Sequence, residues 1–314
     1  MSTPPASAGL PVAIVGVGAW GANVLRDLVA LGCEVWAVAR SPASAERSWA
    51  GGAAGVVSSV ADLPPVRGAV VCTPVRSHSD VVEEIFAAHD VPVAVEKPLT
   101  ADVGEAELLA SRHEGGLFVL DKWRYHPGVQ ELGRIARSGE LGLVTSLHLR
   151  RVSRGHVIRD VDPVWILLPH DLAIVLEVMG YVPAAVHAVQ EESRGGRTGI
   201  VATLGGPPWV NLEVSSQGNA HRRELRMVCE DGVAGLDGGW AQEITIMRQL
   251  DGSAEPEVRP ISGEMPLLAE LRAFVEHLEG GPAPRSSVRE GLEVVRRIAE
   301  LGELGRRLVP EGVR

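Results

Sequence analysis

The feature that most constrains this chain is a glycine-rich turn in the run PVAIVGVGAWGANVLRDLVALGCEVWAVARS, which begins at residue 11. Gly16, Gly18 and Gly21 form a GxGxxG pattern directly after an apolar strand and directly before an amphipathic helix. The first glycine permits a tight turn, the second lets the backbone approach a pyrophosphate, and the third lets helix and strand pack closely. A second apolar strand completes a βαβ unit. The run therefore predicts a dinucleotide-binding fold rather than a glycine-rich turn alone.

The same alternation of strands and helices continues to about residue 121. We expect a short helix near residues 57–63, a strand at 68–74, a helix from about Ser79 to His89, and a strand at 91–97. Continuous apolar strands that alternate with helices are typical of a parallel sheet covered on both faces. The predicted fold class is therefore α/β, with a doubly wound Rossmann domain over residues 1–121.

The sequence pattern changes after Tyr125. We expect a helix over residues 127–140, a strand from about Leu143 to Val152, several segments of alternating polarity between about 182 and 250, and helices near 265–278 and 287–308. Alternating polarity is typical of an antiparallel sheet with one packed face. Residues 122–314 are therefore predicted to form a second, α+β domain with a large, mainly antiparallel sheet.

Charge and cysteine usage argue against several classes of function. A net charge of −10 argues against nucleic acid as a partner, because a phosphate backbone selects for a surplus of Lys and Arg. No apolar run reaches the roughly 18 residues of a membrane span, and the opening MSTPPASAGL lacks the charge and apolar core of a secretion signal. Cys33, Cys72 and Cys229 show no metal or disulfide spacing. We expect a cytoplasmic protein without a membrane partner or a metal site.

The end of the second strand bears on the choice of cofactor. NAD-binding proteins usually place Asp or Glu about 20 residues after the glycine turn, to hold the ribose hydroxyls. This chain has Ala39 followed by Arg40 and Ser41. Without the acid a 2′-phosphate meets less repulsion, and Arg40 supplies a hydrogen-bonding fork. NADP(H) is therefore the predicted preference, with NAD(H) possible if Arg40 stacks on adenine or faces solvent instead.

Several motifs occur in one order along nearly the whole chain: GVGAWG, CTPVRSH (72–78), VEKPLT (95–100), WRYHPGVQEL (123–132), SGELG (138–142) and PHDL (169–172). Together they resemble the glucose-fructose oxidoreductase / inositol dehydrogenase / MocA (Gfo/Idh/MocA) family. The resemblance implies an NAD(P)-dependent oxidoreductase acting on CH–OH groups. It implies cofactor contacts from Gly16, Gly18, Ala19, Trp20, Gly21, Arg40, Ser41, Thr73, Pro74, His78, Glu96 and Lys97.

The resemblance also implies the catalytic residues. In the family, the lysine of Glu-Lys-Pro lies beside the nicotinamide and the reacting hydroxyl, which gives this place to Lys97, where a cation would stabilise a developing alkoxide. His170 would be the general base. With a helix starting near Pro169, His170 would lie at its N-terminal end, where the positive end of the dipole favours neutral imidazole. Asp171 would complement that dipole or contact substrate.

One position departs from the family pattern. Many members carry an aspartate four residues before the histidine, where this chain has Ile166. Acid–base chemistry would then depend on Lys97 and His170 alone, unless Asp160 or Asp162 supplies the missing group. Two alternatives stay open: a core histidine without a catalytic role, and a non-catalytic protein that senses a cofactor or a sugar. A scaffolding subunit would not explain why the catalytic pair is present.

The substrate prediction rests on the motif set and on a basic segment. The segment LRRVSRGHVIR holds four arginines between Arg150 and Arg159, with His156, and would either bind a diphosphate or carboxylate or form a solvated strand edge and loop. The motifs look most similar to members that oxidise the 3-hydroxyl of UDP-N-acetylglucosamine or its uronic acid. Substrate contacts are implied for Arg124, Tyr125, Arg151 and Asp171.

Direction and assembly are predicted more coarsely. The same site run in reverse would make the protein an NADPH-dependent reductase of a keto sugar or an imine. In this family the open face of the antiparallel sheet commonly packs against another subunit. We therefore expect a homodimer or a homotetramer with a small sugar or sugar nucleotide as its ligand.

Overall fold

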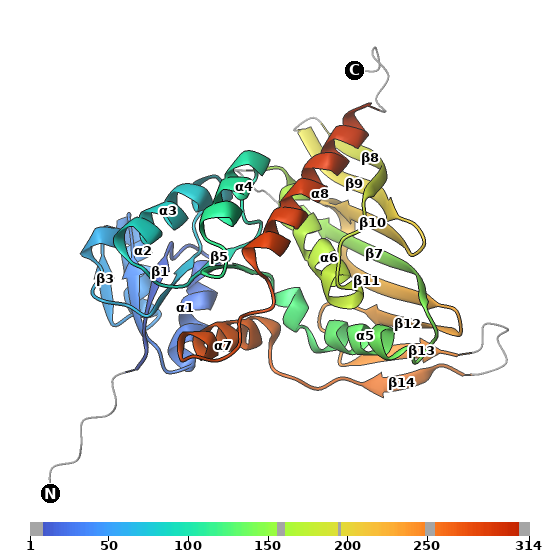
Figure 1. Cartoon of the computed structure of the whole chain (residues 1–314), viewed down its shortest axis with the longest axis horizontal. Helices are drawn as coiled ribbons and strands as arrows, with labels where there is room; N and C mark the ends of the chain where they lie inside the picture. Colours follow the sequence, from blue (N-terminus) through green and yellow to red (C-terminus); the bar gives the residue numbers. More distant parts are fainter. Residues whose placement is uncertain (1–8, 156–160, 194–195, 249–254, 308–314) are drawn as a thin grey trace, which may run out of the picture. The chain divides into compact units, whose positions relative to one another are not determined.

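The computed structural model describes residues 9–155, 161–193, 196–248 and 255–307 (Figure 1). By its contacts the chain divides into two compact units. The first holds the residues up to Leu120 together with Leu267–Leu292, and the second holds Asp121–Pro266 together with the residues from Glu293 onward. The chain therefore returns to the first unit after building most of the second, which the sequence pattern did not predict. The expected division into domains over residues 1–121 and 122–314 stays a prediction.

The first unit contains a six-stranded parallel sheet with the strand order β3-β2-β1-β4-β5-β6. Its strands are β1 (Pro11–Val15), β2 (Glu34–Val38), β3 (Gly55–Val57), β4 (Gly68–Val71), β5 (Val93–Glu96) and β6 (Leu117–Leu120). Its helices are α1 (Gly21–Ala30), α2 (Pro42–Ala50), α3 (His78–Ala88), α4 (Val103–Arg112) and α7 (Pro266–Leu278), with 3₁₀ turns η1 (Val60–Asp62) and η2 (Val75–Ser77). This strand order is that of a doubly wound Rossmann sheet, so the predicted fold class is confirmed.

The core of this sheet is apolar on both faces. Helices α1 and α7 cover one face, and α3 and α4 cover the other (Figure 1). Helix α7 buries Leu271 and Phe274 in the same cluster as Ile14 of β1 and Phe118 of β6. The rings of Phe118 and Phe274 meet edge to face with centroids 6.4 Å apart, a favourable aromatic geometry. These contacts explain why residues 267–292 belong with the parallel sheet.

The second unit contains an eight-stranded sheet in the order β14-β13-β12-β11-β7-β10-β9-β8. Its strands are β7 (Val144–Arg154), β8 (Ala185–Ser193), β9 (Gly196–Gly205), β10 (Trp209–Ser215), β11 (Gln217–Cys229), β12 (Gly232–Asp237), β13 (Glu243–Met247) and β14 (Glu257–Pro260). Strands β7 and β10 run parallel, and the other neighbouring pairs run antiparallel. The prediction of a mainly antiparallel sheet is confirmed.

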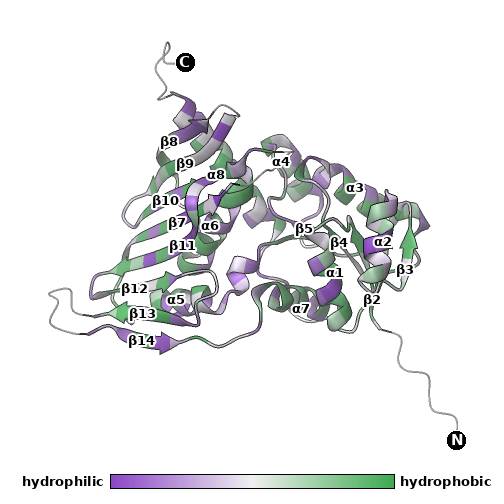
Figure 2. Cartoon of the chain, turned by 180° about the vertical axis from the view of Figure 1, so that it is seen from behind, coloured by the Kyte–Doolittle hydropathy of each residue, from purple (hydrophilic) through white to green (hydrophobic). Residues whose placement is uncertain are grey.

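One face of this sheet is covered by helices α5 (Pro127–Ser138) and α6 (Pro163–Met179) and by α8 (Val288–Arg307) from Val294 onward (Figure 1). Hydrophobic and hydrophilic residues alternate along its strands (Figure 2), as expected for a sheet with one packed face. Helix α6 is mostly apolar and is buried over most of its length, which is typical of a helix in the interior of a protein. None of the described helices is long and apolar enough to cross a membrane.

In the described part of the chain, no helix covers the opposite face of this sheet. A row of outward side chains crosses it from Val189 through Val201 and Glu213 to Arg150. Val189 is 49% exposed, Val201 is 56% exposed, and Trp209 at the start of β10 is 43% exposed. Arg150 and Glu213 form an ion pair at 2.9 Å. The outer face is therefore apolar near β8 and β9 and charged near β7.

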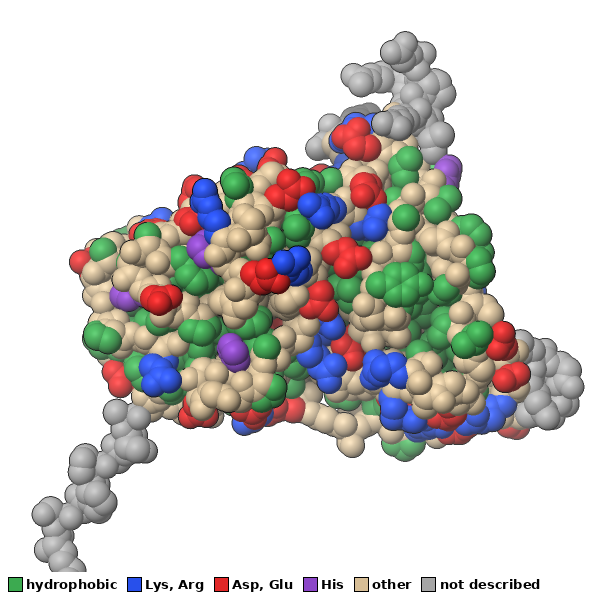
Figure 3. Space-filling view, in the orientation of Figure 1, with side chains coloured by type: hydrophobic (Ala, Val, Ile, Leu, Met, Phe, Trp, Pro, Cys, Tyr) green, Lys and Arg blue, Asp and Glu red, His purple; other side chains and the backbone are tan. Residues whose placement is uncertain are grey.

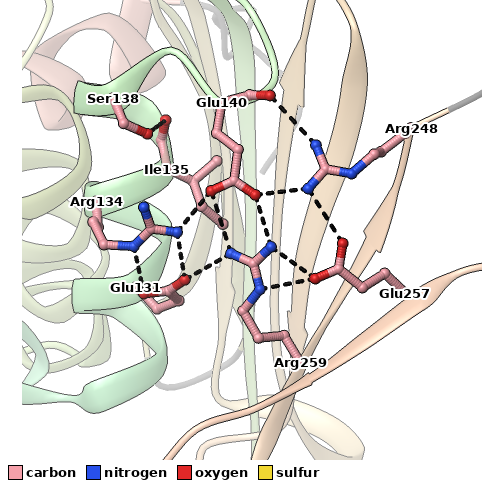
Figure 4. Close-up of polar contacts among 8 residues, drawn as sticks. All are labelled: Glu131, Arg134, Ile135, Ser138, Glu140, Arg248, Glu257 and Arg259. Atoms are coloured by element: carbon pink, nitrogen blue, oxygen red, sulfur yellow. Dashed lines mark hydrogen bonds and ion pairs between the residues drawn. The ribbon is translucent and has the colours of Figure 1, made fainter.

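An ion-pair network joins α5 to strands β13 and β14 (Figure 4), and Lys and Arg side chains gather over these elements at the surface (Figure 3). Glu140 accepts hydrogen bonds of 2.7 Å from Arg259, Arg134 and Arg248. Arg259 in particular holds the pKa of Glu140 well below its ordinary value. Partly exposed ion pairs contribute roughly 0.2–1 kcal/mol each, so the network helps to hold the end strands of the sheet against α5.

Candidate active site

The glycine turn has the geometry that a dinucleotide requires. Gly16 has a φ of +96°, and a Cβ there would lie 2.9 Å from the carbonyl oxygen of Cys72. A Cβ on Gly21 would lie 2.1 Å from the carbonyl oxygen of Gly16, so both positions need glycine for local packing. A Cβ on Gly18 would meet nothing within 4 Å, which leaves open space beside the backbone. The first turn of α1 carries no acidic residue that would repel a pyrophosphate.

A second loop faces the same turn from β4. Strands β1 and β4 are neighbours on either side of the point where the strand order reverses, which is where such sheets bind nucleotides. The methyl group of Thr73 lies close to the Cβ position of Gly16, and its hydroxyl is buried without a hydrogen-bond partner in the described residues. A buried hydroxyl without a partner is costly unless a ligand satisfies it. The open face at Gly18 and the unpaired Thr73 hydroxyl therefore both fit a bound dinucleotide.

The glycine turn is also tied to the Glu-Lys-Pro motif. The indole nitrogen of Trp20 donates a hydrogen bond to the carboxylate of Glu96, the last residue of β5. Ala19 and Trp20 are exposed, and Lys97 follows Glu96 as a half-buried residue. Burial, and secondly the charge of Glu96, raise the pKa of the Cys72 thiol well above its ordinary value. Cys72 is thereby kept neutral, and Lys97 is placed at the carboxyl end of an interior strand, between β4 and β6.

The buried side chain of His78 connects the loop after β4 with the loop after β5. Its Nε2 lies 2.9 Å from the carbonyl oxygen of Thr73, and its Nδ1 lies 3.0 Å from that of Pro98. Burial lowers the pKa of His78, and the charge of Lys97 lowers it further. Pro74 precedes η2 and accepts a hydrogen bond from the hydroxyl of Ser77. His78 therefore stabilises the loop beside Lys97 from a buried position.

The predicted phosphate contact, Arg40, has a partner that the sequence did not suggest. The guanidinium of Arg40 forms a 2.7 Å ion pair with Glu84 of α3, and both side chains are more than a third exposed, at 57% and 39%. Ser41 caps α2 by accepting a hydrogen bond from the amide of Ser44. The carboxylate of Glu84 partly neutralises the cation expected to attract a 2′-phosphate.

In the second unit, His170 does not lie at the start of a helix as expected. Helix α6 begins at Pro163, is capped by Asp162, and contains Pro169 in its interior. The macrodipole acts mainly within the first turn, so it neither favours neutral imidazole at His170 nor places Asp171 at a helix terminus. These two expectations were wrong, because the side chain of Asp162 accepts the amide of Val164 and starts the helix earlier.

His170 has a specific carboxylate partner. Its Nδ1 lies 3.3 Å from Oδ1 of Asp121, and the two side chains are only 16% and 5% exposed. Asp121 starts η3 (Lys122–Tyr125), where its Oδ1 also accepts the amide of Trp123 at 3.1 Å. The indole of Trp123 meets the His170 ring edge-on at 6.4 Å and stacks on His126 at 5.2 Å. The imidazole of His170 is therefore held by a carboxylate and an aromatic ring.

The predicted substrate residues Arg151 and Asp171 lie together in the interior. Their ion pair measures 2.8 Å between two nearly fully buried side chains, and the Arg151 guanidinium lies 4.5 Å from the centre of the Trp123 ring. Burial raises the pKa of Asp171, and Arg151 opposes this shift. Arg223 lies beside Arg151 across β7 and β11, and burial lowers the pKa of Arg223. In this arrangement Arg151 and Asp171 join the sheet to α6.

Arg124 and Tyr125 are also buried, at 8% exposure each. The side chain of Arg124 contacts Glu177 of α6 at 3.4 Å, and Arg137 of α5 donates to the backbone carbonyl of Glu177. Glu177 lies in an apolar run of α6, where a buried carboxylate requires such a partner. These contacts fix η3 to α6.

The predicted basic segment is split between the two faces of the sheet. Arg150 points outward to Glu213, whereas Arg151 points inward to Asp171, because successive residues of a strand alternate. His156, Arg159 and Asp160 lie outside the described residues. Asp162, proposed as a replacement for the missing aspartate, caps α6 and pairs with Arg197. Among the described residues, no group of His, Cys, Asp or Glu could hold a metal ion.

Comparison with known proteins gives one family match. Residues 10–115 match the GFO_IDH_MocA model, described as an oxidoreductase family with an NAD-binding Rossmann fold. This agrees with the resemblance inferred from the motifs. No curated protein matches the chain in sequence.

Solved structures share the fold over nearly the whole chain. UDP-N-acetylglucosamine 3-dehydrogenase GnnA from Acidithiobacillus ferrooxidans is 22% identical with a TM-score of 0.82, covering 96% of this chain and 99% of that one. An oxidoreductase from Agrobacterium radiobacter in complex with NAD+, L-tartaric acid and magnesium is 18% identical with a TM-score of 0.82, covering 95% and 96%. A levoglucosan dehydrogenase in complex with NADH and levoglucosan is 14% identical with a TM-score of 0.83, covering 95% and 98%.

Proposed function

We propose, on the premise that this chain is an oxidoreductase of the Gfo/Idh/MocA family, that it transfers a hydride between a nicotinamide cofactor and a ring carbon of a sugar. The observation that carries the proposal is the placement of Lys97. It follows the last residue of β5, in the same unit as a glycine turn with an open face. Only two of the 30 basic residues are lysines, Lys97 and Lys122, so the compact ammonium at this place is an exception in a chain that otherwise uses arginine.

The proposed chemistry divides between two side chains. Lys97 stabilises negative charge on the sugar oxygen as its proton leaves, because a compact cation acts most strongly where charge develops. His170 accepts that proton, the task of a general base. The bound nicotinamide supplies the hydride acceptor. In the reverse direction His170 returns the proton and Lys97 polarises a carbonyl or imine, so a reductase would use the same residues.

The proposed substrate class is a nucleotide-linked amino sugar oxidised at its 3-hydroxyl, with UDP-N-acetylglucosamine as the first candidate. Two observations support this choice: the PHDL motif at residues 169–172, and the shared fold with a protein described as UDP-N-acetylglucosamine 3-dehydrogenase.

The function is tested by following reduced nicotinamide by absorbance with NAD+ or NADP+ and a panel of sugars. The panel pairs UDP-N-acetylglucosamine with its uronic acid, UDP-glucose, free N-acetylglucosamine and myo-inositol. The proposal expects turnover that depends on both the nucleotide, which free N-acetylglucosamine lacks, and the acetamido group, which UDP-glucose lacks. Turnover with inositol or a free sugar alone would show that a nucleotide-linked amino sugar is not the substrate. Cofactor binding without turnover in either direction would instead favour a sensing protein.

Cofactor choice can be tested at the Arg40–Glu84 pair. Glu84→Gln should strengthen NADP+ binding relative to NAD+ by up to about fivefold, since it frees Arg40 from an exposed pair worth at most about 1 kcal/mol. Arg40→Ala should weaken NADP+ and leave NAD+ nearly unchanged. Fluorescence titration gives both dissociation constants without requiring turnover. Glu83→Gln is the matched control, because Glu83 pairs with Arg112 instead. Equal effects on both cofactors would exclude a phosphate contact at Arg40.

We infer further that the protein assembles as a homodimer or homotetramer through the outer face of the eight-stranded sheet. The exposed apolar side chains of Val189, Val201 and Trp209 support this inference, because apolar patches of this kind mark interfaces. Light scattering should report a dimer or tetramer, and Val201→Glu should shift it toward monomer. A monomeric wild-type protein at micromolar concentration would contradict the inference.

A further inference from the structure

Helix α6 carries a base without the acid that the family motif would place one turn earlier. That position is Ile166, whose apolar side chain can neither orient an imidazole nor stabilise its charge. A histidine that acts as a base needs a partner that orients its ring and stabilises its positive charge. The group hydrogen-bonded to one ring nitrogen decides which nitrogen carries the proton. Another carboxylate in the described second unit would have to take the role of the missing aspartate.

Two aspartates close to His170 in sequence are committed elsewhere. Asp171 is adjacent, but its carboxylate is paired with Arg151 at 2.8 Å, beside Trp123. Asp162 accepts the amide of Val164 at the start of α6 and forms an ion pair with Arg197. Each of the two carboxylates therefore already has an arginine partner. The aspartate required by His170 must therefore come from another element.

We propose that Asp121 is the positioning residue of His170, and that it replaces the aspartate missing from α6. Its Oδ1 lies 3.3 Å from Nδ1 of His170, and both side chains are largely shielded from water. The carboxylate is itself oriented, since the same Oδ1 accepts the amide of Trp123 at 3.1 Å. The replacement comes from a distant part of the chain, 49 residues before the histidine.

The contact determines the chemistry of the imidazole. With Nδ1–H donating to Asp121, the ring carries no proton on Nε2, which is then the nitrogen able to accept one. When the substrate O–H bond breaks, its proton forms an N–H bond at Nε2 and the ring becomes imidazolium. Asp121 stays a carboxylate and stabilises that positive charge, as a buried aspartate does in a serine-protease triad. The proton leaves Nε2 to solvent before the next turnover.

The surroundings also fix the plane of the ring. Trp123 presents its indole at 6.4 Å and 60° to the imidazole, and the indole itself contacts the Arg151 guanidinium and the stacked ring of His126. A ring packed in this way has little rotational freedom. The hydrogen bond from Nδ1 to Asp121 therefore also fixes the direction in which Nε2 points. The buried Arg151–Asp171 pair supports the same geometry through the contact of Arg151 with Trp123.

The proposal rests on the proposed function, and kinetics test it first. Asp121→Asn keeps the shape and the cap of η3, since Asn is also a good N-cap, but removes the charge. It should lower kcat by about 10- to 100-fold with KM within about threefold. Asp162→Asn, the matched control, should stay within about twofold of wild type. In a His170→Ala background, Asp121→Asn should change kcat less than twofold, because the two residues act as one unit. An equal loss in both backgrounds would overturn the pairing.

A second readout does not need turnover. Long-range ¹H–¹⁵N spectra of the histidine side chains report which ring nitrogen is protonated, and His170→Gln identifies the His170 signals among the 10 histidines. The proposal expects the Nδ1–H form in wild type and a changed Nδ1 shift in Asp121→Asn. An Nε2–H form would overturn it. If no sugar is turned over, the proposed function fails, and these spectra still decide the role of Asp121.

Discussion

Lys97→Met is expected to lower kcat/KM by about 10²- to 10³-fold, the loss typical of removing one group that stabilises developing negative charge. Methionine keeps the length of the side chain and removes only the ammonium. Lys97 is half-buried and follows Glu96, which Trp20 of the glycine turn contacts, so a loss in catalysis has to be distinguished from a loss in folding. Steady-state kinetics with the substrate found in the panel, together with a cofactor titration, separate these two possibilities.

Lys122→Met is the matched control, because Lys122 is the other lysine of the chain. Lys122→Met should lower kcat/KM by less than about threefold. Lys97→Arg should recover part of the activity, since the charge is kept while its compact shape is lost. Full turnover in Lys97→Met, or a larger loss in Lys122→Met, would show that the oxygen is stabilised by another group.

His170→Ala should lower kcat by about 10²- to 10⁴-fold in the oxidation direction, the range spanned by general-base catalysis. Added imidazole should restore part of the rate, because a small base can enter the space left by the side chain. His148→Ala is the control: His148 is a partly buried histidine of β7 that contacts the hydroxyl of Ser146 at 3.1 Å. Unchanged kcat in His170→Ala would make His170 a packing residue and leave the base unidentified.

The elements that follow from local periodicity could be predicted from the sequence. The glycine turn, the parallel strands around it and the alternating strands of the second sheet each carry their own pattern over a few residues. The start of α6 could not be predicted in the same way. Pro169 suggested a first-turn position, but Asp162 followed by Pro163 is an equally valid start signal, with its proline six residues earlier. The apolar run alone does not decide between the two.

Most of the polar contacts of the site could not be predicted from the sequence. Asp121 and His170 are 49 residues apart, and Arg40 and Glu84 are 44 apart. Neither pair shares a spacing that a helix or strand would impose. The buried Arg151 did have a local signal, since it alternates with the outward Arg150 along one strand. The return of α7 to the first sheet depends on packing around Phe274, which only the folded chain reveals.

The most direct test of the central claim uses UDP-N-acetylglucosamine carrying deuterium at C3 of the sugar. The protein is incubated with this substrate and NAD+ or NADP+, and the reduced cofactor is analysed by mass spectrometry. Our account predicts that the deuterium is found in the nicotinamide ring, and that its transfer is lost in Lys97→Met and His170→Ala. Reduced cofactor without deuterium would place the oxidation at another carbon. No reduced cofactor, and no reaction of the 3-keto sugar with NADPH, would contradict the account.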